Sequence, residues 1–97
     1  MNLSEAYLKG ILALLARRDF PPEVLADLVG GQKQREAYNL CDGTLGQAEI
    51  VKKLKLDKSN FRKLLSRWVG EGIAFRVEYD NEVRPLHLYP IPANMLK

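Results

Sequence analysis

The stretch LDKSNFRKLLSRWVGEGIA, residues 56–74, has the pattern of an α-helix with two faces of opposite character. Residues spaced at i, i+3, i+4 and i+7 share one side of a helix. On one side the residues at this spacing are apolar: Phe61, Leu64, Leu65 and Trp68. On the other side they are polar or basic: Ser59, Arg62, Lys63 and Ser66. The pattern predicts a helix from Asp57 to Gly70, packed on one face and exposed on the other, with Asp57 as its N-cap.

Positive charge is concentrated in this part of the chain. The 97 residues carry 15 Lys and Arg against 12 Asp and Glu, a net charge of only +3, and residues 1–33 are neutral. Residues 52–67 hold seven cations and a single anion, Asp57, which gives a local charge of +6. The cations are Lys52, Lys53, Lys55, Lys58, Arg62, Lys63 and Arg67. A local excess of this size favours a polyanionic partner.

After Gly72 the period of the sequence changes from that of a helix to that of a strand. Apolar residues alternate with polar or small ones from Ile73 to Tyr79, which is the repeat of a half-buried strand. Asp80-Asn81-Glu82 supplies a turn, and Val83 to Tyr89 supplies a return strand that Pro85 confines to an edge or a strand start. We expect a β-hairpin here.

Several helices are expected before residue 56. We place one from near Ser4 to about Arg18, one from Pro22 to Val29 that ends at Gly30-Gly31, and one from about Gln34 to Cys41. A further helix runs from Gly46 or Gln47 to Leu54 and is joined to the helix at 57–70 by a very short link. The fold class is therefore mainly α with a small β-hairpin wing (α+β).

The order of elements is typical of a winged helix-turn-helix with two extra N-terminal helices. We expect an N-terminal helical extension over residues 1–33, a winged helix-turn-helix domain over residues 34–91 and a short tail over residues 92–97. The first helix has an apolar stripe wider than packing on one small core requires. Its members are Tyr7, Leu8, Ile11, Leu12, Leu14 and Leu15. We interpret them as a homodimer interface, with the alternative that they cover the chain's own core.

Residues 56–74 also resemble the recognition-helix signature of MarR-type and ArsR-type transcription regulators. Those families commonly read Leu-Asp-x-Ser-Thr-Val-Ser-Arg, then a leucine-rich turn and Glu-x-x-Gly-Leu-Val. The resemblance covers about residues 34–91. It implies a homodimer on operator DNA, with the helix at 57–70 in the major groove and the wing near the adjacent minor groove or backbone.

The resemblance and the charge pattern together assign a set of DNA-binding residues. By position, Gln47 matches a phosphate contact of those families, and the DNA-facing positions of the helix are Lys58, Ser59, Asn60, Arg62, Lys63 and Arg67. The helix pattern adds Ser66, the preceding lysines Lys52, Lys53 and Lys55 add phosphate contacts, and the base of the wing adds Arg76 and Arg84.

The chain departs from those families in three ways. Its wing tip is acidic, with Glu78, Asp80 and Glu82, where family wings are usually basic. The paired cysteines of ArsR metal sites are absent. MarR proteins add dimerisation helices after the wing, whereas this chain ends soon after Tyr89, so dimerisation is expected to fall to the first helix.

The sequence offers few residues for disulfide, metal or catalytic chemistry. With one cysteine and one histidine, Cys41 and His87, we expect no disulfide, no metal and no cofactor. We interpret Cys41 as a buried apolar residue, His87 as structural or surface, and Tyr38 and Trp68 as core. Neither Ser59 nor Ser66 has a nearby base, so we do not expect an enzyme. No apolar run reaches the length of a membrane span and no signal peptide is apparent, so we expect a cytoplasmic protein.

The sequence thus favours one function and leaves a second open. The first is sequence-specific binding of double-stranded DNA by a homodimeric transcriptional regulator at a near-palindromic site. The alternative is a winged-helix module that binds a protein partner or RNA within a larger assembly. The acidic wing tip and the apolar first helix motivate this alternative.

Overall fold

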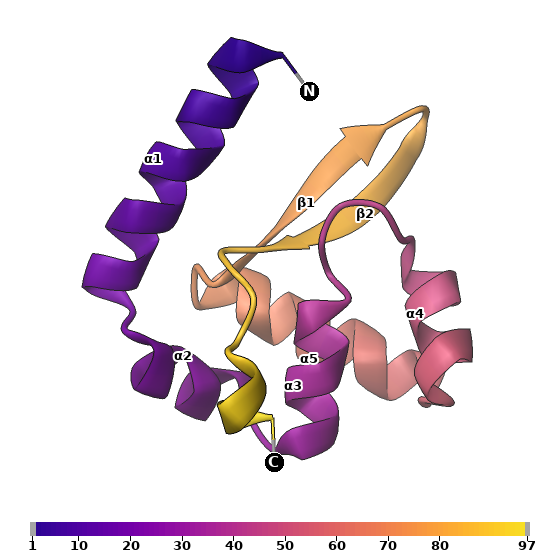
Figure 1. Ribbon diagram of the computed structural model, residues 1–97. Helices are drawn as coiled ribbons and strands as arrows, with labels where there is room; N and C mark the ends of the chain where they lie inside the picture. The colour runs from indigo at the N-terminus through magenta and orange to yellow at the C-terminus, as the bar shows by residue number, and fades with distance from the viewer. Residues whose placement is uncertain (1, 97) are drawn as a thin grey trace.

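The computed structural model describes residues 2–96, without the side chain of Tyr79, and is mainly helical with one small antiparallel hairpin (Figure 1). It belongs to the α+β class that the sequence predicts. The elements are α1 (Leu3–Asp19), α2 (Pro22–Val29), α3 (Gln32–Asn39), α4 (Gln47–Leu54), α5 (Lys58–Gly70), β1 (Ala74–Tyr79), β2 (Glu82–His87) and the 3-10 helix η1 (Ala93–Met95).

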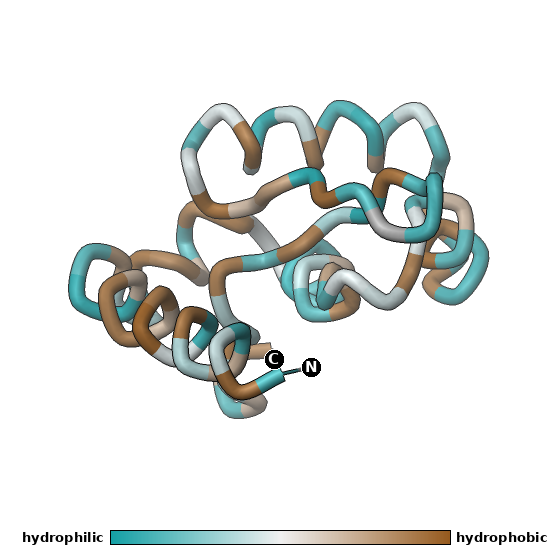
Figure 2. Tube along the Cα trace, turned by 90° about the horizontal axis from the view of Figure 1, so that it is seen from above, coloured by the Kyte–Doolittle hydropathy of each residue, from teal (hydrophilic) through white to brown (hydrophobic). Residues whose placement is uncertain are grey.

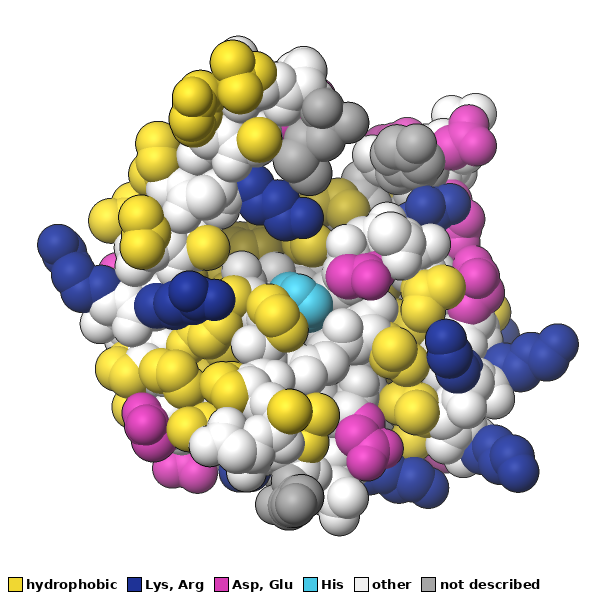
Figure 3. Space-filling model, viewed as in Figure 1, with side chains coloured by type: hydrophobic (Ala, Val, Ile, Leu, Met, Phe, Trp, Pro, Cys, Tyr) yellow, Lys and Arg dark blue, Asp and Glu magenta, His cyan; other side chains and the backbone are white. Residues whose placement is uncertain are grey.

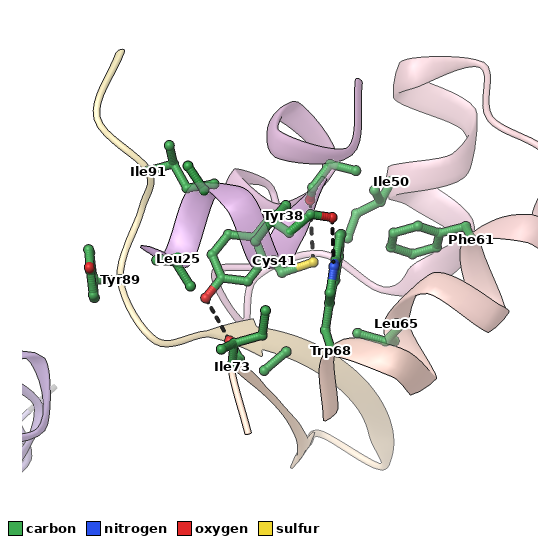
Figure 4. Packing of buried hydrophobic residues seen from close by; sticks show 14 residues of the cluster. Leu25, Tyr38, Cys41, Ile50, Phe61, Leu65, Trp68, Ile73, Tyr89 and Ile91 are labelled. Carbon is green, nitrogen blue, oxygen red and sulfur yellow. Dashed lines mark hydrogen bonds between the residues drawn. The ribbon is translucent and has the colours of Figure 1, made fainter. Parts of the chain in front are cut away.

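The core lies between α2, α3, α4, α5 and the base of the hairpin (Figure 4). Tyr38 and Trp68 are fully buried and meet edge to face, with ring centroids 5.3 Å apart. The polar atoms of both side chains make hydrogen bonds. The Tyr38 hydroxyl donates to the Ile73 carbonyl at 2.6 Å, and Trp68 Nε1 donates to the Val29 carbonyl at 3.2 Å. The expectation that Tyr38, Cys41 and Trp68 are core residues is confirmed.

The hairpin has a regular register and a tight turn. β1 and β2 pair from Ala74 opposite His87 to Tyr79 opposite Glu82. Asp80 and Asn81 both have positive φ angles, of 55° and 63°. Two left-handed residues in succession form the hairpin turn whose twist matches that of the strands. The loop after α3 runs beside β2, because the His87 N–H donates to the Cys41 carbonyl at 2.6 Å.

The second helix belongs to the core, which corrects the expected extension over residues 1–33. Leu25, Ala26 and Val29 of α2 are buried. Arg35 of α3 fixes the position of α2, since its Nε donates to the Gly30 carbonyl at 2.8 Å. The folded unit therefore starts at α2 and not at residue 34. The sequence pattern of α2 gave no sign of this, because burial of a short apolar face depends on what folds against it.

The segment over residues 92–97 is likewise not a separate tail as far as the structure describes it. Ile91 is buried, and its backbone makes two hydrogen bonds with the Asn39 side chain, at 2.9 and 2.7 Å. Arg35 Nη1 donates to the Met95 carbonyl at 2.8 Å, so η1 is attached to α3. The chain up to Leu96 packs on the domain.

In contrast, α1 stands apart from the rest of the molecule (Figure 1). None of its residues is buried, and hydrophobic residues recur along it in Figure 2. It is held at its C-terminal end, where Arg17 lies 5.1 Å from the ring centre of Tyr89 and the Tyr89 hydroxyl donates to the Phe20 carbonyl. Among the described residues, no helix has the length and apolar character that crossing a membrane requires.

Candidate nucleic-acid interface

Two helices, α4 and α5, are joined by a turn that is fixed by local hydrogen bonds. Gly46 caps α4, and its N–H donates to the Glu49 side chain at 3.4 Å. Lys55 ends α4 in the left-handed conformation, with φ of 55°, and α5 begins three residues later. The Asp57 side chain then accepts from the Asn60 N–H at 2.8 Å and caps α5, as the sequence predicts.

The two-faced pattern of α5 is confirmed. Phe61, Leu65 and Trp68 are at most 2% exposed and hold the helix against the core. The opposite side is exposed along its length and comprises Ser59, Arg62, Lys63 and Ser66, with Lys58 and Asn60 beside them. We call these six residues the α5 face. Within residues 2–96, no hydrogen bond or ion pair to the side chains of Lys58, Arg62 or Lys63 is found, so their charged groups are available to a ligand.

The lysines that precede α5 extend this positive surface. Lys52 and Lys53, in the last turn of α4, and Lys55, in the turn, are all exposed. Figure 3 shows Lys and Arg side chains projecting from the side of the molecule where α4 lies in Figure 1. Gln47, at the start of α4, is half-buried. The predicted phosphate contacts and the α5 face are thus carried by two consecutive helices.

Arg67, which the sequence groups with the DNA contacts, is directed toward α2 and does not belong to the α5 face. Its Nη2 donates to the carbonyls of Leu28 at 3.0 Å and Val29 at 2.7 Å, and its Nε lies 3.9 Å from the Glu71 carboxylate. These carbonyls end α2, where a helix leaves its last carbonyls without intrahelical partners. Arg67 therefore joins α5 to α2.

The arginines of the hairpin also have intramolecular partners. Arg84 donates to the Gly43 carbonyl at 3.5 Å and to the Glu82 carboxylate at 3.3 Å, and its side chain is only 18% exposed. Arg84, which the sequence groups with the DNA contacts, is thus mostly buried and bonded within the hairpin region. Arg76 is exposed and donates to the Ser66 hydroxyl at 3.1 Å, so it borders the α5 face.

The structure places one acidic residue of the wing, Glu82, where the sequence pattern did not predict it. The Glu82 carboxylate lies at the N-terminal end of α4, where it occupies the space that a Cβ of Gly46 would fill. An anion is favoured at this end of a helix. Glu82 therefore lies next to Gln47, the residue that the resemblance assigns to a DNA phosphate. In the sequence, only Gly46, the residue before Gln47, indicates that another side chain could come this close to the start of α4.

His87 and Cys41 have structural surroundings. Since a carbonyl only accepts, His87 Nδ1 donates to the Tyr38 carbonyl at 3.0 Å, and burial lowers the pKa of His87. Burial also raises the pKa of the Cys41 thiol to about 12, and the thiol donates to the Ala37 carbonyl at 3.3 Å. A thiol of this kind is unreactive at neutral pH. Among the described residues, no three His, Cys, Asp or Glu side chains are grouped as metal ligands.

The six residues predicted as a dimer interface all lie exposed on α1. They are Tyr7, Leu8, Ile11, Leu12, Leu14 and Leu15, with exposed fractions of 47–70%. Phe75 of β1 is also exposed, at 47%, although the strand pattern predicts it on the half-buried face. The reason is that α1 stands away from the hairpin and leaves this side of β1 uncovered.

A scan against protein-family models, a search of curated proteins and a search of solved structures each found no match to this chain.

Proposed function

We propose that this chain is a sequence-specific, double-stranded DNA-binding protein of the winged helix-turn-helix type that acts in transcription regulation. The observation that supports the proposal is the α5 face. A rigid helix, fixed by Phe61, Leu65 and Trp68, projects cations and hydrogen-bonding side chains that have few partners within the chain. The major groove of B-DNA admits such a helix and offers acceptors to Arg and Lys and a donor–acceptor pair to Asn.

The residues of the interface divide into two roles. Asn60, Arg62 and Lys63 project from the first half of α5 and are assigned to base edges. Lys52, Lys53, Lys55 and Lys58 lie in the preceding helix, the turn and the start of α5, and are assigned to phosphates. Phosphate contacts set the register and most of the affinity, whereas base contacts select the sequence.

The hairpin has a smaller part in this proposal than the resemblance implies. Its tip carries Glu78, Asp80 and Glu82, which phosphates repel, and Arg84 is held by other groups. Only Arg76, at the base of β1 and next to Ser66, is placed to add a cation beside the α5 face. We therefore assign the DNA contact to α4 and α5, with Arg76 at its margin.

Salt dependence tests the proposal most directly. Duplexes that bind the protein are selected from a random library at two salt concentrations, and the affinity of the selected duplex is measured by fluorescence anisotropy. With four to six phosphates neutralised, the affinity should fall with a slope of about −4 to −5 in log K against log salt. Binding that does not weaken with salt, or that is undetectable near 100 mM salt, would contradict DNA recognition.

The α1 helix favours a second candidate function, an interaction module for a protein partner or RNA. Its exposed apolar residues and the acidic hairpin tip are the features that a DNA contact alone does not use. A chain that stays monomeric and binds no duplex would favour this module. A dimer that selects a near-palindromic duplex would favour the DNA-binding function.

A further inference from the structure

The α1 helix is apolar on more than one side, which is unusual for a helix without a single buried residue. Leu12 and Leu15 point toward the rest of the chain, whereas Tyr7, Ile11 and Leu14 line a different, outer side. A surface helix needs an apolar stripe of only about 100° to pack on one neighbour, and the apolar surface of α1 is wider than that. The chain's own core contacts α1 only near its C-terminal end, through Ala16.

An open cavity of about 670 Å³ separates α1 from the hairpin. Leu12, Ala16 and Phe20 form one wall, and Phe75, Leu86 and Leu88 form the other. We call this cavity the α1 cleft. Figure 3 shows this hollow, with the histidine at its lower edge. Its walls are mainly apolar, and each wall carries a large exposed side chain, Leu12 on α1 and Phe75 on β1.

We propose that the α1 cleft is filled by α1 of a second copy of this chain, in a reciprocal, intertwined dimer. The helix of the partner then lies between α1 and the hairpin. By two-fold symmetry, α1 lies in the cleft of the partner in the same way. The order across the interface is hairpin, partner α1, own α1, partner hairpin. This arrangement specifies the dimer of the proposed function but does not depend on DNA binding.

The intertwined order explains both apolar sides of α1. The side with Leu12 and Leu15 packs against the same side of the partner helix, since both helices face the shared space. The outer side, with Leu14 and Tyr7, packs against the partner's hairpin, where Phe75 is exposed. A small molecule in the cleft would leave this outer side in water. A second copy covers both sides with one contact.

The available apolar area fits a stable dimer. Seven large side chains of α1 are 47–70% exposed: Leu3, Tyr7, Leu8, Ile11, Leu12, Leu14 and Leu15. Each such side chain offers on the order of 100 Å² of apolar surface. With Phe75 their sum approaches the roughly 800 Å² that each partner contributes to a typical specific interface.

The charges at the ends of α1 favour an antiparallel pair. Glu5 lies in the first turn, and Arg17 and Arg18 lie in the last. A parallel pair would bring the arginines of both copies together. An antiparallel pair places Glu5 of each helix near the arginines of the other and also opposes the helix dipoles. A two-fold axis perpendicular to the two helices relates them as an antiparallel pair.

Sedimentation analysis of the full chain without DNA tests the dimer. The wild type should sediment as a dimer of the 11.0 kDa chain. Leu12→Glu, Leu14→Glu and Phe75→Glu should each raise the dimer dissociation constant roughly 30-fold or more, as central interface residues do. Val24→Glu is the matched control, because Val24 is exposed to 45% on α2, away from the cleft, and should leave the dimer intact. Circular dichroism checks that each variant is folded.

Cross-linking distinguishes the intertwined dimer from a simple pair of α1 helices. Leu14→Cys and Phe75→Cys are made separately in a Cys41→Ala background, mixed, and treated with a short thiol cross-linker. The proposal expects a Leu14–Phe75 product between chains, and none from the control pair of Leu14→Cys with Val24→Cys. A monomeric wild type would overturn the proposal. So would a dimer that is insensitive to Phe75→Glu and gives no Leu14–Phe75 product, whatever the DNA affinity.

Discussion

Arg62 and Arg67 lie on the same helix but have opposite environments. Arg62 has an exposed charge on the α5 face, whereas Arg67 donates to two carbonyls at the end of α2. We expect Arg67→Ala to lower the free energy of unfolding by about 1–2 kcal/mol, because the charged hydrogen bonds of a half-exposed arginine to two carbonyls are lost. We expect Arg62→Ala to leave stability unchanged and to weaken specific DNA binding by about 1–3 kcal/mol. Urea titrations and anisotropy measure the two effects.

Each of the two arginine variants is the matched control for the other, since each removes one positive charge from α5. Equal losses of DNA affinity would show that Arg67 contacts DNA as Arg62 does, despite its hydrogen bonds to the end of α2. The sequence could not distinguish them, because both fall in the same basic run. What separates them is the carbonyl end of α2, which lies far from α5 in the sequence and meets it only in the folded chain.

His87 should make the fold sensitive to mild acid. Burial, together with the charge of Lys9, lowers its pKa, while the bond to the Tyr38 carbonyl and the charge of Asp42 oppose that shift. The folded state therefore binds fewer protons than the unfolded chain once the pH falls below the ordinary value of 6.5. Stability should be full above this pH and should decline below it.

His87→Gln tests this effect, since glutamine can donate to the Tyr38 carbonyl without titrating. The difference in unfolding free energy between wild type and His87→Gln should change between pH 7 and pH 5, in the direction that favours the variant in acid. A difference that stays constant over this range would mean that His87 has the same pKa in the folded and unfolded chain.

At the scale of elements, the β1–β2 hairpin is expected to oppose DNA binding through Glu82. Its carboxylate lies at the N-terminal end of α4, where Gln47 is expected to meet a phosphate. Glu82→Gln should strengthen DNA binding, because one nearby charge in partly exposed surroundings is worth about 1 kcal/mol, or roughly fivefold. The gain should shrink as salt increases. Anisotropy titrations at two salt concentrations measure it.

Asp80→Asn is the matched control for Glu82→Gln. It removes the same charge from the turn of the hairpin, but the nearest atoms to a Cβ at Gly46 belong to Glu82 and Glu49 and not to Asp80. Glu82→Gln should therefore have the larger effect. Equal gains from the two variants would show that only the total charge of the hairpin matters and that the end of α4 is not a phosphate contact.

Periodicity predicts the elements well where a single period holds over several turns. The buried and exposed faces of α5 could be predicted because Phe61, Leu65 and Trp68 repeat on one side over the whole helix. The hairpin could be predicted from its alternation and its turn residues. The burial of Leu25 and the exposure of Phe75 could not, because each depends on whether a distant element covers that side. Local pattern predicts which side of an element is apolar, and only tertiary packing decides whether that side is covered.

On the scale of the whole molecule, α1 and α5 have different tasks in the proposed function. We propose that the α5 face makes the contacts to one half-site and that α1 makes the contacts between copies. A dimer makes the second half-site contact intramolecular, which raises its effective concentration and therefore the affinity for a double site. The spacing of the half-sites must then match the distance between the two α5 helices.

Because α1 and α5 have different tasks, we expect a mutation in one helix to remove the dimer contacts or the DNA contacts without affecting the other. The wild type should bind two half-sites one DNA turn apart, roughly 34 Å, much more tightly than the same half-sites offset by half a turn. Leu12→Glu should abolish this preference and lower affinity for the double site, while affinity for an isolated half-site stays unchanged because α5 is intact. Arg62→Ala should weaken both duplexes and keep the spacing preference. If Leu12→Glu weakened the isolated half-site as strongly as the double site, α1 would be acting on DNA or on the fold of α5, and not through a second copy.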